Sequence, residues 1–506
     1  MTSGVGRHME DFYSACLTGD MLLAKHYLDV GVDPNLAFDH TGLTALMLVA
    51  SLGHTNIVNL LLLGGNIYVD QVDSVGRSAF LYAIDHGQKS ICNILLHEGC
   101  DNEIKDYDGK NGILIASERG HLDIISLLVD NYGMSIFYET DNQGNSAYLL
   151  AAASGKNAVV EYILEKYSKV WGSFLTTITG GKSIYKNMNG MNGFCMAAIG
   201  GHLDTVRLLI NMRINEINDK SAIGNTALLY ACEHGHSSIA KLLLDNGSKM
   251  SAKNNNHENA FHLSIKSGSI ETLKLLYTLG INTAERDING WNAFMHSCIY
   301  GHTSIMKFLL NNLNFDFNEK DNQGMSCLML CAKYAPPTYF QVAQLLIEMG
   351  IYVNSKSYTG ETALTLACEL GDEKLVDLLL SHSADLNVKT KDGYTPFMKA
   401  SMHGHINICL NLIRKGADIT TINTFGETSL DIFGISNHAH LTGNLLQLYI
   451  DKIKSAWKKE RIWLRRKHFV KCLAESQLLG PMTSSQSSQH HVFSNFELVR
   501  YITAYI

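Results

Sequence analysis

The chain has 506 residues, of which 46% are hydrophobic and 18% charged, and its net charge at pH 7 is −7. This length exceeds one ordinary globular core, so several domains or a repeat array are expected, and the composition excludes a disordered chain. The eleven cysteines include no CxxC pair, which favours free thiols in a reducing compartment. The first residues lack the apolar core of a signal peptide, and no apolar run is long enough to span a membrane. We therefore expect an intracellular, soluble chain.

A short motif, D-x-x-G or a near variant, recurs between residues 39 and 436 at intervals of about 33 residues. Its last position is occupied by Gly42, Gly76, Gly109, Gly144, Gly190, Gly224, His257, Gly290, Gly324, Gly360, Gly393 and Gly426. Only the interval from Gly144 to Gly190 is irregular, being about a dozen residues longer than the others. Self-similarity at a fixed period predicts a stack of repeated structural units.

Two helices are predicted in each repeat. Two residues after the motif stands a Thr, Ser or Asn, which are the side chains that cap the first turn of a helix. These residues are Thr44, Ser78, Asn111, Ser146, Asn192, Thr226, Asn259, Asn292, Ser326, Thr362, Thr395 and Thr428. Apolar and small residues follow, and a glycine such as Gly53 or Gly301 ends the helix. A second apolar-periodic segment, such as IVNLLL, completes the pair.

The unit G-x-T-x-L-x-x-A-x-x-x-G-H-x-x-I-V-x-L-L-L-x-x-G-A-D-x-N, of which residues 392–419 are a close example, resembles the ankyrin repeat. The resemblance implies an all-α, right-handed solenoid of stacked helix-turn-helix units with projecting hairpin loops. It divides the chain into an N-terminal capping repeat (1–38), an array of about twelve repeats (39–436) and a C-terminal helical extension. The family's proline remains only as Pro396 and its helix histidine only as His262.

The same resemblance implies a function. Ankyrin proteins bind protein partners at the hairpin tips and on the inner helices, where stacking makes the surface continuous. We therefore expect a non-enzymatic protein–protein interaction scaffold that needs no cofactor, is monomeric, and has protein partners of unknown identity rather than nucleic acid.

The positions at the hairpin tips and on the inner helices, which are expected to face a partner, change in character along the array. Those of repeats two and three are mostly charged and include Arg77, Asp85, Lys110 and Arg119. Those of repeats eight to ten are apolar and aromatic, as interface hot spots are. The predicted partner-binding residues are Ile288, Trp291, Ile299, Tyr300, Met325, Tyr334, Tyr358 and Leu370. The alternative for each residue is that it packs against the neighbouring repeat.

The irregular interval contains TTITGGKS, which ends like the G-x-x-x-x-G-K-[ST] loop that surrounds a phosphate with backbone N–H groups. The first glycine is missing, because Thr176 holds its place. The strand and helix that must flank such a loop are also missing from the pattern. Residues 168–187 are therefore predicted to be a lengthened surface loop, and nucleotide binding at GGKS remains the weaker alternative.

The abundant histidines do not form a metal-binding pattern. Six of them directly follow the glycine between the two helices, a structural position in the ankyrin family: His54, His121, His202, His236, His302 and His405. HENAFH (257–262) spaces its histidines five apart, which would place them about 140° apart on a helix instead of on one face. We therefore predict neither a metal site nor a catalytic residue.

Residues 437–475 are predicted to contain a basic amphipathic helix. The stretch 451–471 carries nine Lys or Arg residues and two acids. Its main basic residues are Lys458, Lys459, Arg461, Arg465, Arg466 and Lys467. A helix that caps the last repeat is one reading; an anionic membrane surface, a calmodulin-like partner or nuclear import are the others. The expected location is the cytosol, with the nucleus as the alternative that this segment allows.

The end of the chain is predicted to be a Ser/Gln-rich linker (476–491) followed by an apolar helix (492–506). This helix resembles, over about a dozen residues, the F-box-like element that follows ankyrin arrays in poxvirus proteins and recruits a ubiquitin ligase. It lacks the opening proline of that element. A substrate adaptor for a ubiquitin ligase is therefore the alternative function, beside packing of the helix onto the array.

Overall fold

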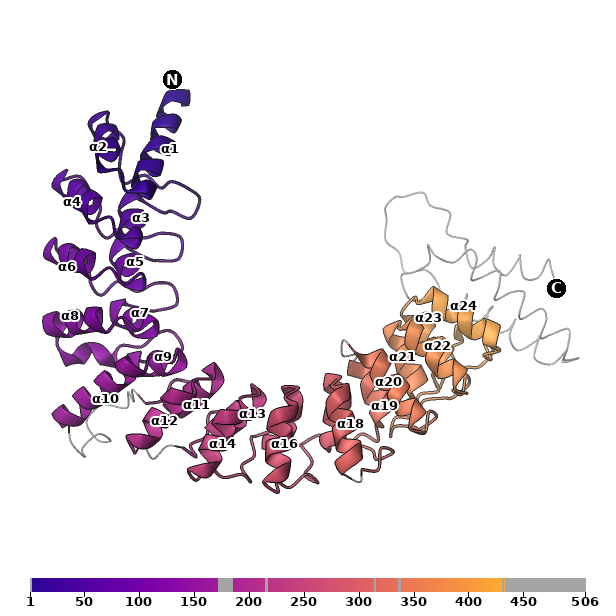
Figure 1. The fold of residues 1–506 in the computed structure, drawn as a ribbon. Helices are drawn as coiled ribbons and strands as arrows, with labels where there is room; N and C mark the ends of the chain where they lie inside the picture. Colours follow the sequence, from indigo (N-terminus) through magenta and orange to yellow (C-terminus); the bar gives the residue numbers. More distant parts are fainter. Residues whose placement is uncertain are drawn as a thin grey trace, which may run out of the picture. The chain divides into compact units, whose positions relative to one another are not determined.

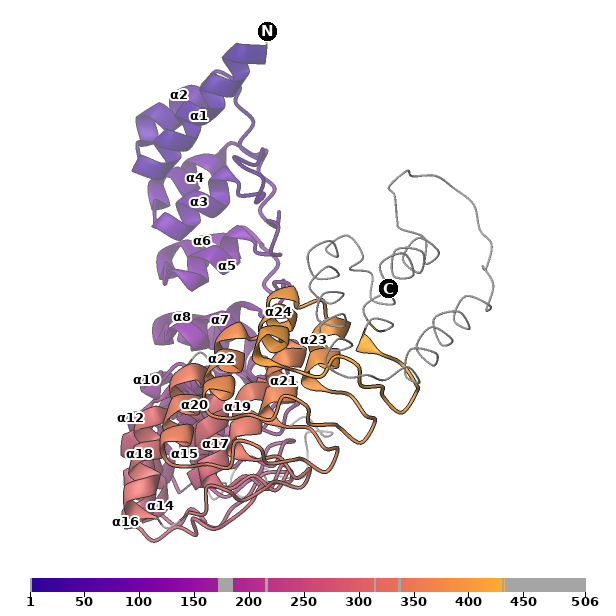
Figure 2. The same ribbon diagram turned by 90° about the vertical axis from the view of Figure 1, so that its right-hand side faces the viewer.

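The computed structural model describes residues 2–171, 185–213, 217–313, 315–334, 338–429 and 432. Twenty-four α-helices and one 3-10 helix occur in these stretches, which contain isolated β-bridges but no strand. The chain forms two compact units, Met1–Ile288 and Asn289–Ile506. Within each unit, helix pairs follow one another in sequence order and loops project from their ends (Figures 1 and 2). The predicted all-α solenoid of stacked helix pairs is confirmed.

The helices of the first unit form two rows. The first-helix row consists of α1 (Thr2–Thr18), α3 (Ala45–Leu52), α5 (Ala79–Asp85), α7 (Gly112–Arg119), α9 (Ala147–Ala153), α11 (Gly193–Gly200), α13 (Ala227–Glu233) and α15 (Ala260–Lys266). The second-helix row consists of α2 (Met21–Asp29), α4 (Thr55–Leu63), α6 (Lys89–His97), α8 (Leu122–Tyr132), α10 (Asn157–Trp171), α12 (Leu203–Asn211), α14 (Ser237–Asp245) and α16 (Ile270–Thr278). The 3-10 helix η1 (Met134–Tyr138) follows α8.

The second unit repeats this arrangement. Its first-helix row consists of α17 (Ala293–Tyr300), α19 (Cys327–Tyr334), α21 (Ala363–Leu370) and α23 (Pro396–Met402). Its second-helix row consists of α18 (Thr303–Asn312), α20 (Tyr339–Glu348), α22 (Glu373–Ser381) and α24 (Ile406–Lys415). None of the helices in the described residues of either unit is long and apolar enough to cross a membrane.

The predicted helix caps are confirmed wherever the structure gives them. The Oδ1 of Asn292 accepts from the N–H of Met295 at 2.9 Å, and Thr395 caps α23 in the same way. The helix-ending glycine is also confirmed, since Gly301 has the left-handed conformation (φ +75°) that side-chain-bearing residues avoid. Each cap contributes about 1 kcal/mol to its helix.

The first residue of each hairpin motif holds the tip. The Oδ1 of Asp321 accepts from the backbone N–H groups of Gln323 and Met325, both at 2.8 Å. The same pair of bonds is formed by Asp73, Asp106, Asp141, Asn187, Asn254 and Asn423. The motif is therefore a turn in which a side chain replaces a backbone acceptor.

Backbone hydrogen bonds join neighbouring tips. In the first unit the N–H of Ser74 donates to the C=O of Thr41 at 2.7 Å, and in the second unit Asn322 donates to Asn289 at 3.0 Å. One such bond links every consecutive pair of tips within each unit. The tips therefore form a continuous ladder, and a side chain on one tip has a fixed position relative to the next.

The histidines after the inter-helix glycine also join repeats. The Nε2–H of His202 donates to the C=O of Ala153 at 2.9 Å, and that of His405 to Glu369 at 3.1 Å. The same bond is formed by His54, His121 and His236. Because a carbonyl oxygen can only accept, each Nε2 must carry the proton. The predicted structural role of these five histidines is confirmed.

One hairpin tip has a non-glycine residue in a backbone conformation that favours glycine. His257 takes the place of the motif glycine and has φ +62°, a conformation that costs an L-residue roughly 1 kcal/mol or more. We expect His257→Gly to stabilise the first unit by about 0.5–1 kcal/mol. The measurement is the temperature of thermal unfolding, which should rise. Asn256→Gly, one residue earlier, is the control and should be neutral or destabilising. An unchanged or lower melting temperature for His257→Gly would show that the tip bears no strain.

Several predictions fall on residues outside the described stretches. These are the GGKS segment (180–183), the basic residues Lys458, Lys459, Arg461, Arg465, Arg466 and Lys467, the linker 476–491 and the terminal helix 492–506. The prediction of a loop over 168–187 needs one correction, because α10 continues to Trp171. The apolar periodicity of this segment extends past Tyr167, which favours continued helix over a loop.

Candidate partner-binding surfaces

The predicted partner-binding residues of the second unit lie along one edge of its first-helix row. Tyr300, Tyr334 and Leu370 are the last residues of α17, α19 and α21. Tyr334 is 46% exposed and Leu370 is 53% exposed, while Tyr300 is partly exposed. Trp291, in the slot between the tip glycine and the helix cap, is partly exposed as well. The stacking of the helices therefore presents one side chain per repeat on this edge.

Three of the eight predicted residues need a different description. Met325 is 2% exposed and Ile299 is 9% exposed, so the expectation of an exposed side chain is wrong for both. Both side chains are buried within the second unit and are not available to a partner. Ile288 is 54% exposed and is the last residue of the first unit. The remaining five, Trp291, Tyr300, Tyr334, Tyr358 and Leu370, are called the aromatic surface below.

Ring contacts connect the aromatic surface across two repeats. Trp291 meets Tyr334 edge to face, with ring centroids 5.5 Å apart and planes at 80°. On its other side Trp291 meets His296 at 5.7 Å and 79°, and His296 stacks on Tyr300 at 6.1 Å. Each contact of this kind contributes about 0.5–1.5 kcal/mol beyond burial. These side chains are therefore held in place before any partner arrives.

A buried carboxylate orients Trp291. The Nε1–H of Trp291 donates to the Oδ2 of Asp321 at 3.0 Å, while the Oδ1 of Asp321 holds its own tip. Asp321 is 6% exposed. The sequence motif marks Asp321 as a turn residue only. Its second role depends on a hydrogen-bond donor in the preceding repeat, which a search for catalytic or metal-binding patterns does not reveal.

Tyr358 extends the aromatic surface along the tips. It is 62% exposed, and its N–H donates to the C=O of Gln323 at 2.9 Å. Its ring lies against Gly324, where an added Cβ would come within 2.7 Å of the ring atom Cδ1. A glycine at 324 is therefore needed both for the turn (φ +77°) and for the position of this ring.

The aromatic surface ends where charged pairs begin. Lys399, on α23, forms ion pairs with Glu369 at 2.8 Å and Glu361 at 3.9 Å, and its ammonium lies 5.7 Å from the ring centroid of Tyr394. These groups satisfy one another within the array. The aromatic surface therefore lies on α17, α19, α21 and the tips that precede α17 and α21.

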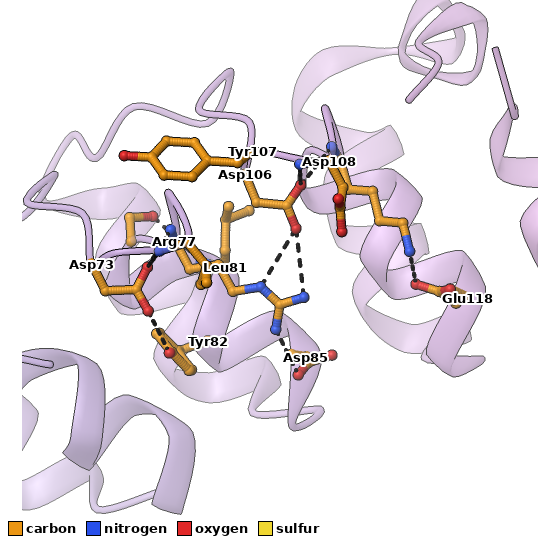
Figure 3. A network of polar contacts seen from close by, with 12 residues as sticks. Asp73, Arg77, Leu81, Tyr82, Asp85, Asp106, Tyr107, Asp108 and Glu118 are labelled. Atoms are coloured by element: carbon orange, nitrogen blue, oxygen red, sulfur yellow. Dashed lines mark hydrogen bonds and ion pairs between the residues drawn. The ribbon is translucent and has the colours of Figure 1, made fainter. Parts of the chain in front are cut away.

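The corresponding surface in the first unit is a network of ion pairs (Figure 3). Arg77 bonds to Asp85 at 3.2 Å and to Asp106 at 3.4 Å, which links two consecutive repeats. Arg119 approaches the same Asp85 at 2.5 Å, and Lys110 bonds to Glu118 at 2.7 Å. The predicted charged character of this surface is confirmed, but most of these charged side chains form ion pairs with one another.

The network makes the stability of the first unit depend on pH. Burial alone would raise the pKa of Asp85, but Arg119 and Arg77 outweigh it and hold this pKa below its usual range. A lowered folded-state pKa stabilises the fold above the unfolded-state value of about 4, and this contribution is lost as pH falls through the folded-state value. We expect Asp85→Asn to destabilise the unit by about 1 kcal/mol at pH 7 and by almost nothing below about pH 3.

The measurement is hydrogen exchange of α5 and α7 as a function of pH, with Asp130→Asn on α8 as the control. Asp130 is exposed and forms no ion pair, so its replacement should change exchange little at either pH. An Asp85→Asn effect of the same size at pH 7 and pH 3 would contradict the assignment, because the charge of the carboxylate would then contribute nothing.

The cysteines offer no reactive group in the described residues. The ten described cysteines are all free and buried. Burial raises the pKa of Cys16 and that of Cys331 to about 12, so neither is a thiolate at neutral pH. Within the same stretches, no group of three or more His, Cys, Asp or Glu residues is placed to hold a metal ion.

Comparison with known families agrees with this geometry. A family model described as ankyrin repeats (3 copies) matches residues 12–106, 102–172, 175–254, 194–287, 261–357 and 341–423. Consecutive matches overlap or nearly adjoin, as expected when a model of three units is placed on a longer array. The matches cover both units.

Two of the relatives carry the ankyrin repeat in their names, and this chain covers different shares of each relative. The ankyrin repeat and KH domain-containing protein mask-1 of Caenorhabditis elegans is 28% identical over 455 residues, which is 79% of this chain and 16% of the relative. The putative ankyrin repeat protein L371 of Acanthamoeba polyphaga mimivirus is 26% identical over 254 residues, 47% of this chain and 30% of the relative. The probable 26S proteasome regulatory subunit p28 of Saccharomyces cerevisiae is 33% identical over 150 residues, 29% of this chain and 64% of the relative.

This chain thus spans less than two thirds of each of these relatives, from 16% of the worm protein to 64% of the yeast protein. The two relatives named as ankyrin repeat proteins share that repeat with this chain. With the family model matched across both units, and with the capped helix pairs and linked hairpin tips described above, the chain belongs to the ankyrin repeat family.

Proposed function

We propose that the chain is a non-enzymatic scaffold that binds a protein partner through the aromatic surface of its second unit. Ankyrin repeats generally serve protein–protein interaction. The observation that carries the specific proposal is the contact between Trp291 and Tyr334. It joins two repeats and leaves Tyr334 46% exposed.

The chemistry of this surface suits a protein partner. Interface hot spots are enriched in Trp and Tyr, which bring large contact areas at little cost in conformational entropy. The side chain of Trp291 is already oriented by Asp321, and the ring of Tyr358 lies against Gly324. Pre-organisation of this kind increases affinity because less freedom is lost on binding. The partner contributes an apolar segment that packs against the edge between Tyr334 and Leu370.

Affinity capture from cell lysate tests the proposal with two matched variants. Tyr334→Ala/Tyr358→Ala/Leu370→Ala removes three exposed side chains of the aromatic surface. Lys307→Ala/Gln341→Ala/Gln344→Ala removes three exposed side chains from α18 and α20 in the second-helix row. All six residues are exposed, so both variants should fold, which circular dichroism checks.

We expect the first variant to capture less than about a tenth of the partner that the intact chain captures, since each hot-spot truncation costs about 2 kcal/mol or more. The second variant should capture as much as the intact chain. Equal capture by both variants would place the binding surface elsewhere and overturn the proposal.

A further inference from the structure

A strip of exposed apolar side chains runs over the hairpin loops of the second and third repeats, in the first unit. Tyr68 is 71% exposed, Val75 is 49% exposed and Tyr107 is 68% exposed. Val75 and Tyr107 are neighbours, because the N–H of Tyr107 donates to the C=O of Val75 at 3.0 Å. The ring of Tyr107 also lies against Gly76, where an added Cβ would come within 2.7 Å of the ring atom Cδ1. The tip of one loop thus supports the aromatic ring of the next.

The bases of the same two loops are joined as well. The N–H of Asp101 donates to the Oδ1 of Asp70 at 2.8 Å, and the N–H of Glu103 donates to the Oδ1 of Asp101 at 2.9 Å. Tyr68 is tied to the preceding loop, since its N–H donates to the Oδ1 of Asn35 at 2.8 Å. Bonds at the tip and at the base therefore hold each loop in a fixed position relative to its neighbour.

The strip lies in the most acidic part of the chain. Residues 1–150 contain 19 acidic and seven basic residues, a net charge of −12, whereas the whole chain carries −7. Asp101, Glu103 and Asp108 are exposed on the two loops, and none of them forms an ion pair. The loops' own cation, Lys105, is bonded to Glu139 at 2.7 Å.

The other cationic side chains near the tips also form ion pairs. Lys110 bonds to Glu118, and Arg77 bonds to Asp85 and Asp106, as Figure 3 shows. The strip therefore combines apolar contact area with unpaired carboxylates, and no free cation in the loops balances them. An occupant with the complementary chemistry carries positive charge interleaved with apolar side chains.

We infer that this acidic hairpin surface, formed by Tyr68, Val75, Asp101, Glu103, Tyr107 and Asp108, binds a segment of a partner protein in which Lys or Arg alternates with apolar residues. The guanidinium groups pair with the carboxylates and lie over the face of Tyr107, where a cation is attracted by the ring. The apolar residues cover Val75 and Tyr68. This inference goes beyond the aromatic surface, which belongs to the other unit, and does not depend on it.

The probe is a short fluorescein-labelled peptide in which arginine alternates with leucine, titrated with the full chain and followed by fluorescence anisotropy. Asp101→Asn/Glu103→Gln/Asp108→Asn should weaken binding about tenfold, because exposed charge pairs contribute up to about 1 kcal/mol each. Tyr107→Ala should weaken it about tenfold or more. Raising the ionic strength from about 0.01 to about 0.15 M should weaken binding too, since the Debye screening length falls from ~30 to ~8 Å.

Two controls separate this surface from general attraction to an acidic protein. Asp29→Asn/Asp123→Asn/Asp130→Asn removes the same charge from exposed positions on second-row helices, and should weaken binding less than about twofold. The peptide with glutamate in place of arginine should not bind. Equal weakening by the two charge variants, or binding of the glutamate peptide, would overturn the inference. So would unchanged affinity for Tyr107→Ala, since apolar contact would then contribute nothing.

Discussion

Asp321→Ala is expected to destabilise the second unit by about 3 kcal/mol. The buried carboxylate accepts three hydrogen bonds, two from backbone N–H groups of its own tip and one from Trp291. A hydrogen bond contributes about 1 kcal/mol, more when one partner is charged, and buried donors left without an acceptor add to the loss. Because repeat arrays open locally, the measurement is hydrogen exchange of α17 and α19, which should become faster by about two orders of magnitude.

Asp321→Asn separates the two roles of this side chain. Asn187, Asn254 and Asn423 hold their tips with Oδ1 alone, so the substitution should keep the turn. The amide nitrogen that it introduces cannot accept from the Nε1 of Trp291. We expect a loss of about 1 kcal/mol and weaker capture of the partner. If Asp321→Asn and Asp321→Ala were equally destabilising, the tip bonds would not be the larger contribution.

Gly193→Ala is expected to destabilise the first unit by about 2 kcal/mol, although alanine occupies the same slot in most repeats. An added Cβ at Gly193 would come within 2.6 Å of the Cζ of Tyr148, a side chain that is 1% exposed and cannot retreat. Overpacking of a core costs about 1–3 kcal/mol, which exceeds the gain of replacing glycine in a helix. The measurement is the free energy of unfolding or the exchange rate of α9 and α11.

Gly112→Ala and a double variant test the steric explanation. At Gly112 the added Cβ would meet the terminal methyl of Ile84, which can rotate away, so the loss should stay below about 1 kcal/mol. Tyr148→Leu introduces the smaller residue that other repeats have at the equivalent position, as at Leu46 and Leu228. Gly193→Ala should then cost much less in the Tyr148→Leu background than in the natural one. Equal costs in the two backgrounds would rule out the clash.

Much of the fold follows from the sequence because each repeat carries its own local chemistry. A capping side chain, a helix-ending glycine and a turn aspartate recur at fixed distances, and each acts on backbone groups a few residues away. Thr395 and Gly301, for example, act as the sequence predicts. The histidines are predictable for a similar reason, since each of them bonds to the repeat immediately before it.

The choice between aspartate and asparagine at the tips also has a local cause. Asn254 and Asn423 donate from Nδ2 to Glu258 and Glu427, both at 2.8 Å, four residues later. Asp73 instead accepts at Oδ2 from the hydroxyl of Tyr82 at 2.7 Å. At these three tips the carboxylate meets a hydrogen-bond donor, and each amide meets an acid.

The candidate surface was less predictable, because exposure depends on packing between repeats. Ile299 and Met325 occupy positions that face a partner in the family pattern, yet both are buried. Conversely, the bond from Trp291 to Asp321 joins residues 30 positions apart. Neither side chain alone signals that bond, since tryptophan occurs in this slot only once in the chain.

Photo-crosslinking tests whether the second unit holds a protein partner on its aromatic surface. The full chain would carry p-benzoylphenylalanine at Tyr334, which is 46% exposed at the end of α19. In a second version it would replace Gln344, which is exposed on α20. We predict one discrete crosslinked product from position 334 in lysate, lost with Asp321→Ala and absent from position 344. Crosslinks from position 344 with none from position 334 would contradict the account.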